Sequence, residues 1–135
     1  MRYWINTISR DDVQSGPSAV EPRLKRASKG DVVIFYSPRT GIHSGEQVQR
    51  FTGIAEVIAE SPHQATFVAS TEAPVRPLID SLDFIRNKKS WGVTFRRGFF
   101  EIAESDYQKI AAAMSVYNRS DGEHDLMAAS GPSGS

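Results

Sequence analysis

The stretch that decides the fold is Val32-Val33-Ile34-Phe35-Tyr36, which directly follows the turn Ser28-Lys29-Gly30-Asp31. An unbroken apolar run of this length is typical of a strand that is buried on both faces at the centre of a sheet. The next residues, Ser37-Pro38-Arg39-Thr40-Gly41, are of types that form turns and are expected to end the strand. The sequence therefore predicts a central strand around which a sheet is built.

Further strands are predicted on both sides of this central one. The aromatic and β-branched stretch from Tyr3 to Ile8 suits a pleated surface, and a long strand is expected from Gln47 to Ala59, where Gly53 indicates a bulge or a close backbone approach. Shorter strands are expected at Gln64 to Ala69, Ala73 to Arg76 and Phe99 to Ile102. Because no βαβ spacing separates them, a closed or nearly closed sheet in an α+β fold is favoured.

Short helical turns are predicted between the strands. Ser9 or Arg10 is expected to open one turn, which Gly16-Pro17 ends. A second turn is expected from Pro77 to Leu82, because proline is tolerated at the first position of a helix.

The length of 135 residues predicts a single domain with a tail. Ser105 can cap a final helix that runs through Tyr117 and packs one face on the sheet. The residues that follow are polar and end in Ser-Gly-Pro-Ser-Gly-Ser. We therefore expect a domain over residues 1–117 and a disordered tail over residues 118–135.

The overall composition excludes several classes of protein. Lys plus Arg and Asp plus Glu both number 16, so any contact with a phosphate backbone must come from a local basic patch. The absence of cysteine excludes disulfides, thiolate nucleophiles and cysteine-ligated metals. The N-terminus lacks the pattern of a signal peptide and no stretch is long enough to span a membrane, so a cytoplasmic protein is expected.

The residues that could carry catalysis or hold a metal are scattered. His43, His63 and His124 lack the spacing of metal ligands or of a catalytic triad, and solvated loop histidines explain them better. Helix starts and solvated surface explain the carboxylate pairs Asp11-Asp12, Asp80 with Asp83 and Glu101 with Glu104. We expect no catalytic residues, no metal and no cofactor.

One stretch combines aromatic and basic residues: Lys88-Lys89-Ser90-Trp91-Gly92-Val93-Thr94-Phe95-Arg96-Arg97-Gly98. A surface that binds phosphates and stacks on a base typically combines cations with large aromatic rings. The alternative is that Trp91 and Phe95 anchor the core and the cations only solvate a loop. Composition alone somewhat favours this alternative.

Two other places could present polar groups to a planar ligand. At Tyr36-Ser37-Pro38-Arg39-Thr40, a buried strand ends in small polar residues, although an ordinary turn explains them equally well. Trp4 and Asn6 share one face of the first strand, where an asparagine amide could pair with a base edge. A tryptophan in the core is again the simpler interpretation.

Several segments occur together in the order and spacing of one known family. They are Tyr3-Trp4-Ile5, Ser9-Arg10-Asp11, Gly30-Asp31, Phe35 to Thr40, Phe51 to Ala55, Val75 to Ile79, Leu82, Phe84-Ile85, Lys88-Lys89, Trp91-Gly92, Phe95 to Gly98 and Glu101-Ile102. On these segments, the chain from Arg2 to Met114 resembles the EVE domain family.

The resemblance implies a PUA-like fold, which is a mixed, mostly antiparallel β-barrel of five to six strands with short peripheral helices and a C-terminal helix. Such domains are related to YTH domains, which hold a methylated adenine in an aromatic cage. EVE domains are similar in having a pocket suited to a modified base, often a methylated or hydroxymethylated cytosine in DNA, and some belong to modification-dependent restriction systems. The resemblance thus implies a non-catalytic reader that extrudes the base and stacks it on aromatic walls.

The matched segments also imply a set of site residues. The base pocket would be formed by Trp4, Asn6, Tyr36, Ser37, Pro38 and Trp91. The phosphates would lie near Arg39, Lys88, Lys89, Arg96 and Arg97. Relatives commonly carry a longer insert where this chain has only Ser15 to Ala27, so one pocket wall is expected to be absent or rebuilt.

Two other functions stay open at this point. One is a PUA-like accessory module that binds RNA, which competition between matched DNA and RNA would detect because only RNA offers the 2′-hydroxyl. The other is a sensor of a nucleoside or small metabolite, which the balanced net charge supports and which added salt would leave unaffected. We expect a monomer that binds nucleic acid and does not bind a membrane. A restriction or modification enzyme could be its protein partner.

Overall fold

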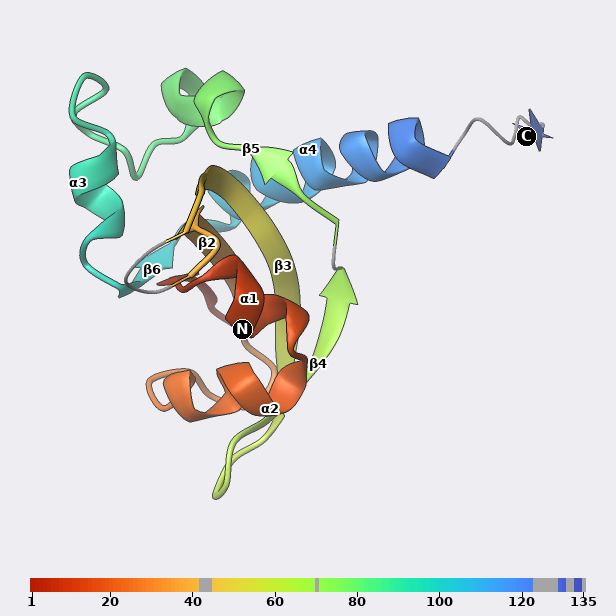
Figure 1. The fold of residues 1–135 in the computed structure, drawn as a ribbon. Helices are drawn as coiled ribbons and strands as arrows, with labels where there is room; N and C mark the ends of the chain where they lie inside the picture. The colour runs from red at the N-terminus through yellow and green to blue at the C-terminus, as the bar shows by residue number, and fades with distance from the viewer. Residues whose placement is uncertain (42–44, 70, 123–128, 131–132, 135) are drawn as a thin grey trace.

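A computed structural model of the chain describes residues 1–41, 45–69, 71–122, 129–130 and 133–134 (Figure 1). The strands are β1 (Tyr3–Thr7), β2 (Val32–Arg39), β3 (Gln47–Ala59), β4 (Gln64–Ala69), β5 (Ala73–Pro74), β6 (Phe99–Ile102), β7 (Ala129–Ser130) and β8 (Ser133–Gly134). The helices are α1 (Arg10–Gln14), α2 (Pro17–Val20), α3 (Gly92–Phe95) and α4 (Glu104–Gly122), with 3-10 turns η1 (Glu21–Arg23) and η2 (Arg76–Ser81).

The main sheet has six strands in the order β4-β3-β2-β1-β6, with β5 paired to β3. β1 and β2 are parallel, whereas all other pairs in this sheet are antiparallel. The predicted mixed, mostly antiparallel α+β fold is therefore confirmed. Pairing among the described residues begins at β4 and ends at β6, so the sheet is open there, and the predicted closure into a barrel is not seen because β4 and β6 do not pair. β2 lies at the centre of the sheet, as the apolar run predicted.

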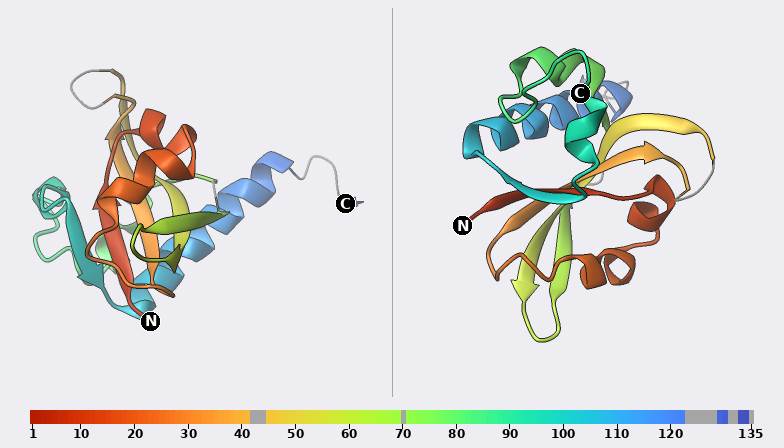
Figure 2. Two further views of the ribbon diagram at one scale, coloured as in Figure 1. Left: turned by 90° about the horizontal axis from the view of Figure 1, so that it is seen from below. Right: turned by 90° about the vertical axis from the view of Figure 1, so that its left-hand side faces the viewer.

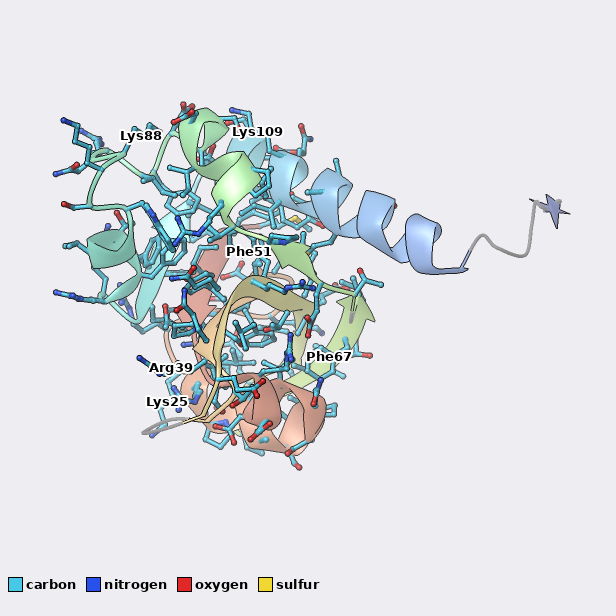
Figure 3. All side chains as sticks on the ribbon, turned by 45° about the horizontal axis from the view of Figure 1, so that its top comes forward. Lys25, Arg39, Phe51, Phe67, Lys88 and Lys109 are labelled. Carbon is cyan, nitrogen blue, oxygen red and sulfur yellow. The ribbon has the colours of Figure 1, made fainter. Side chains whose placement is uncertain are left out.

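Helices lie on both faces of the main sheet (Figure 2), and the sheet separates two hydrophobic cores. The α4-side core contains Ile34 and Tyr36 of β2, whereas the α1-side core contains Val33 and Phe35. This alternation follows the period of two along a strand, and the burial of all four side chains explains the unbroken apolar run. Phe51 of the α4-side core and Phe67, which packs against the α1-side core, are labelled in Figure 3.

The long strand β3 has the predicted bounds, and its bulge lies where Gly53 indicated. The register with β2 shifts between Phe35, which pairs with Gly53, and Tyr36. A Cβ atom at Gly53 would lie 3.1 Å from Cγ1 of Val13, so the closest neighbour of this glycine is a side chain rather than another backbone segment.

The predicted end of the central strand at Ser37 is wrong. β2 continues to Arg39, because Ser37 pairs with Arg50 and Arg39 pairs with Gln47 of the long β3. Pro38, which has no N–H to donate, sits at a register irregularity between these two pairs. The predicted strand from Ala73 to Arg76 is also shorter, since Arg76 already begins η2.

The short helices mostly follow the predicted signals. Ser9 caps α1, because its Oγ accepts a hydrogen bond of 3.2 Å from the backbone N–H of Asp12. Gly16 has a φ of 105° and is followed by α2, so the Gly16-Pro17 pair ends one helix and begins the next. The Ser15 to Ala27 segment thus folds as helical turns whose Val20 and Leu24 enter the α1-side core.

The C-terminal helix extends further than the sequence predicted. α4 runs from Glu104 to Gly122, so it begins before Ser105 and passes Tyr117. Of the predicted tail, residues 118–122 belong to α4, 129–130 and 133–134 form β7 and β8, and 123–128, 131–132 and 135 lie outside the described residues. Of the helices described, none is both long and apolar enough to cross a membrane.

Candidate functional site

A cavity of about 470 Å³ opens where β1 and β2 end, beside α3. Because β1 and β2 are parallel, their carboxyl ends meet at one edge of the sheet, which places Thr7 next to Pro38 and Arg39. We call it the aromatic cavity. It is lined by Thr7, Tyr36, Pro38, Arg39, Gln49, Trp91, Gly92, Phe95 and Arg96.

Three aromatic rings shape the wall of this cavity. The rings of Tyr36 and Phe95 are stacked, with centroids 3.9 Å apart and an interplanar angle of 20°. Trp91 stands at 79° to Phe95, with ring centroids 6.2 Å apart. Phe95 is buried in the core, whereas Trp91 is only half-buried. Trp91 is therefore the ring that offers apolar surface to a ligand.

A hydrogen bond joins β1 to the C-terminal end of α3, which carries Phe95. The Oγ1 of Thr7 donates to the backbone carbonyl of Phe95 over 2.7 Å. The carbonyl of Gly98 also accepts a hydrogen bond of 2.8 Å from the backbone N–H of Thr7. The C-terminal end of α3 and the residues that follow it are thus tied to the end of β1, which preorganises this part of the wall.

The phenol of Tyr36 stays protonated at neutral pH. Burial raises its pKa well above the ordinary value of tyrosine, and the charge of nearby Arg76 only partly opposes this shift. A protonated phenol can both donate and accept a hydrogen bond. The Arg76 guanidinium also lies 5.5 Å from the centroid of the Trp91 ring, within cation–π range.

Polar groups stand at the rim of the aromatic cavity. Arg39 and Arg96 are exposed and bring positive charge to it. Gln49 adds a side-chain amide and has a φ of 52°, which is uncommon for a residue other than glycine. Its backbone carbonyl accepts a hydrogen bond of 3.0 Å from the N–H of Val75, so the turn toward η2 stabilises this conformation.

Of the predicted pocket residues, Tyr36, Pro38 and Trp91 meet in the aromatic cavity. Ser37, the residue after Tyr36 in β2, does not line the cavity and is fully buried. Its Oγ lies 2.8 Å from Oγ1 of Thr52, so the two hydroxyls satisfy each other inside the protein.

Trp4 and Asn6 share a face of β1 as predicted, but it is the face opposite the cavity. The indole N–H of Trp4 donates to the Asp31 carboxylate over 3.1 Å, and its ring packs against Phe99 at a centroid distance of 5.2 Å. Asn6 donates from Nδ2 to the carbonyl of Gly98, while its buried Oδ1 has no partner among the described residues. The simpler interpretation, a core tryptophan, therefore describes the position of Trp4.

Only two of the five predicted phosphate-binding residues line the cavity. Arg39 and Arg96 line the cavity, but Lys88 donates from Nζ to the carbonyls of Ile79 and Leu82 over 3.0 and 2.9 Å. Lys88 lies beside η2, well separated from Arg39 (Figure 3). The Arg97 guanidinium lies 4.7 Å from the Phe100 ring, and Lys89 is exposed without lining the cavity.

The sequence did not single out several residues that line or border the cavity. Phe95 belongs to the basic aromatic stretch, but the family resemblance does not place it among the pocket residues. Thr7 and Gln49 gave no signal, because their roles depend on where strands end and on a φ angle set by tertiary contacts. The one sequence signal for a role of Arg76 at the cavity is its place directly before Pro77, because the proline ends the preceding strand there.

A metal site is not evident in the described part of the chain. Within it, no group of three or more His, Asp or Glu side chains lies close enough together to hold a metal ion. His63 contacts the Ala27 carbonyl through Nε2 at 2.8 Å, whereas His43 and His124 lie outside the described residues.

Comparisons with known proteins agree on the identity of the domain. The EVE domain family matches residues 2–113. A UPF0310 protein from Mycolicibacterium gilvum (strain PYR-GCK) is 39% identical over 137 residues, covering 86% of this chain and 97% of the relative. Another from Mycobacterium avium (strain 104) is 38% identical over 136 residues, covering 85% and 99%. The similarity thus extends over nearly the whole length of these relatives.

A solved structure supports the fold independently of sequence. The NMR structure of Rpa0253 from Rhodopseudomonas palustris superposes with a TM-score of 0.52 and covers 86% of this chain and 94% of that chain. Its sequence identity is only 11%, so the likeness concerns the arrangement of the backbone alone.

Proposed function

Since this chain belongs to the EVE domain family, we propose that it is a non-catalytic, PUA-like binding domain that holds a modified nucleobase of a nucleic acid in its aromatic cavity. The observation that carries the proposal is the half-buried Trp91 ring, held beside Tyr36 and Phe95 at a rim that bears Arg39 and Arg96. A planar base would stack on the ring while its phosphates meet the cations.

The size and chemistry of the cavity suit a base. Its volume of about 470 Å³ lies within the range of roughly 300–1,000 Å³ found for small-molecule pockets. The Tyr36 phenol and the Gln49 amide can pair with the polar edge of an extruded base, which would otherwise lose its hydrogen bonds at a cost of about 1–3 kcal/mol. Apolar surface beside them would favour an added methyl group, and the polar groups of the lining could pair with the hydroxyl of a hydroxymethyl group.

The proposal is tested by binding of labelled oligonucleotides at low salt. Single-stranded and duplex DNA, and matched RNA, would each carry one cytosine, 5-methylcytosine or 5-hydroxymethylcytosine, and fluorescence anisotropy would report affinity. We expect one modified oligonucleotide to bind about 5- to 150-fold more tightly than its unmodified match, as about 1–3 kcal/mol of apolar discrimination implies. If none of the oligonucleotides binds, the proposal is wrong.

A matched pair of variants distinguishes the effect on binding of a charge at the cavity from the effect of the net charge of the protein. Arg96 lines the aromatic cavity, whereas Arg86 is an exposed arginine beside a different hollow near β6. Arg96→Gln is expected to weaken binding and to reduce the slope of log affinity against log salt by about 0.7–0.9. Arg86→Gln removes the same charge and should leave both unchanged. The expected monomeric state and a partner enzyme stay predictions.

A further inference from the structure

A second hollow adjoins the aromatic cavity across the end of β2. Its volume is about 270 Å³, and we call it the arginine hollow. It is lined by Thr7, Ile8, Ser9, Arg23, Pro38, Arg39 and Gly41. Because Thr7, Pro38 and Arg39 line both spaces, the two are neighbours at the end of β2.

The arginine hollow is positively charged. The described residues that line it include Arg23 and Arg39 but no acidic side chain. The ion pairs found among the described residues involve other cations, so neither arginine is neutralised by a carboxylate within that part of the chain. Arg39 donates from one terminal nitrogen to the carbonyl of Gly45 over 3.3 Å, which leaves most of its donors available.

A hydroxyl adds a further donor to the same wall. The Oγ of Ser9 accepts the N–H of Asp12, so its own O–H is still available to donate. Ser9 is nearly buried, at 6% exposure, and its position is fixed by this cap. Two guanidinium groups and a fixed hydroxyl around one hollow form a set of donors that matches the acceptor oxygens of a phosphate.

We propose that the arginine hollow binds the phosphate attached to the nucleoside whose base occupies the aromatic cavity. The proposal rests on the proposed function and deepens it, because it assigns the phosphate of the bound nucleotide to one specific hollow. Arg23 comes from η1, in the shortened Ser15 to Ala27 segment, so this segment supplies a specific contact as well as core residues. Arg39 would serve both spaces.

The test compares ligands that differ only in the phosphate. Calorimetry would measure binding of the modified nucleoside preferred by the protein, its 5′- and 3′-monophosphates, and a short oligonucleotide that contains it. We expect at least one monophosphate to bind about tenfold more tightly than the nucleoside, as charge-assisted hydrogen bonds allow. A further gain for the oligonucleotide would identify a polymer as the source of the phosphate, and no further gain would identify a free nucleotide.

Variants assign the gain to the arginine hollow. Arg23→Gln should abolish the advantage of the monophosphate while leaving nucleoside affinity unchanged, and Arg23→Lys should restore part of it. Lys25→Gln is the matched control, because Lys25 is an exposed cation of the same segment that lines a different hollow. Thermal melting of each variant would confirm that it folds, and Arg39→Gln provides a second variant from another element.

The outcomes separate this inference from the proposed function. Equal binding of the nucleoside and both monophosphates would overturn the inference and leave base binding intact. An equal loss from Arg23→Gln and Lys25→Gln would also overturn it, since the effect would then come from the summed charge. Failure of every nucleoside, nucleotide and oligonucleotide to bind would overturn both proposals.

Discussion

The two tryptophans of this chain occupy similar surroundings on opposite faces of the sheet, yet they differ in what they leave available. Trp4 has the Arg26 guanidinium 5.4 Å from its ring centroid, and Trp91 has that of Arg76 at 5.5 Å. The Trp4 indole N–H is paired with Asp31 and its ring is 4% exposed, whereas Trp91 is half-buried at a cavity. An aromatic ring beside a cation therefore becomes a candidate binding site only where the fold leaves it incompletely covered.

The largest effect is expected from Trp4→Ala. Removal of a buried tryptophan leaves a cavity in the α1-side core and should lower the free energy of unfolding by about 3–5 kcal/mol. Urea denaturation followed by circular dichroism would measure this loss. Trp4→Phe keeps most of the apolar volume and should cost less. A loss below about 1 kcal/mol for Trp4→Ala would contradict its assignment as a core residue.

The next effect concerns Asp31, the hydrogen-bond partner of Trp4. Burial raises the pKa of the Asp31 carboxyl, but hydrogen bonds from the Ser28 N–H, the Trp4 indole and the Arg2 N–H lower it by more, so it lies below the ordinary value. The stability that these bonds provide should be complete above about pH 4 and be lost as pH falls through the pKa of the folded protein.

Asp31→Asn tests that interpretation. An amide cannot accept all three hydrogen bonds with the strength of a carboxylate, so the free energy of unfolding at pH 7 should fall by about 1–3 kcal/mol. The variant should also lose part of the acid-dependent change in stability. Urea denaturation between pH 2.5 and 7 would measure both, and an unchanged pH profile would count against the role of this carboxylate.

For Trp91→Ala the expected effect lies in binding rather than in folding. Loss of a base-stacking ring should weaken oligonucleotide binding by about 1–3 kcal/mol, while the free energy of unfolding changes less than for Trp4→Ala. Val93→Ala is a matched control, because Val93 belongs to the same α3 segment and is 54% exposed. Anisotropy titrations together with urea curves would separate the two tryptophans. Equal affinity of wild type and Trp91→Ala would refute stacking on this ring.

The smallest effect separates two neighbouring lysines. Lys88 donates to two carbonyls of the η2 region, so Lys88→Gln should lower the free energy of unfolding by about 0.5–1.5 kcal/mol. Lys89 is exposed, and Lys89→Gln should stay within about 0.5 kcal/mol of wild type. If the loss of Lys88 instead weakened binding without changing stability, its predicted phosphate contact would regain support.

The strands were largely predictable because each has a local signal. Alternation and composition predicted β3 and β4 with their observed bounds, and the serine cap of α1 was visible in the sequence. The continuation of β2 through Pro38 was not predictable, because it depends on pairing with the far part of β3. Local propensity favoured a turn there, and the longer partner strand overrode it.

The candidate site was predictable only in part. Trp91, Tyr36 and Pro38 were identified by composition and family resemblance, and they meet in the cavity. Trp4 and Asn6 were not distinguishable from pocket residues, because the sequence does not state which face of β1 the α3 segment covers. The interaction of Lys88 with backbone carbonyls likewise depends on how η2 folds back.

The bond between Thr7 and the Phe95 carbonyl joins segments far apart in the sequence, and the cavity also needs the end of β2. No part of the chain can assemble this site before the sheet has formed, so the binding-competent state and the folded state coincide. A ligand bound there would therefore stabilise the whole domain against unfolding. At about 100 times its dissociation constant, it would add about 2.7 kcal/mol to the free energy of unfolding, so a melting experiment can detect occupants whose chemistry is unknown.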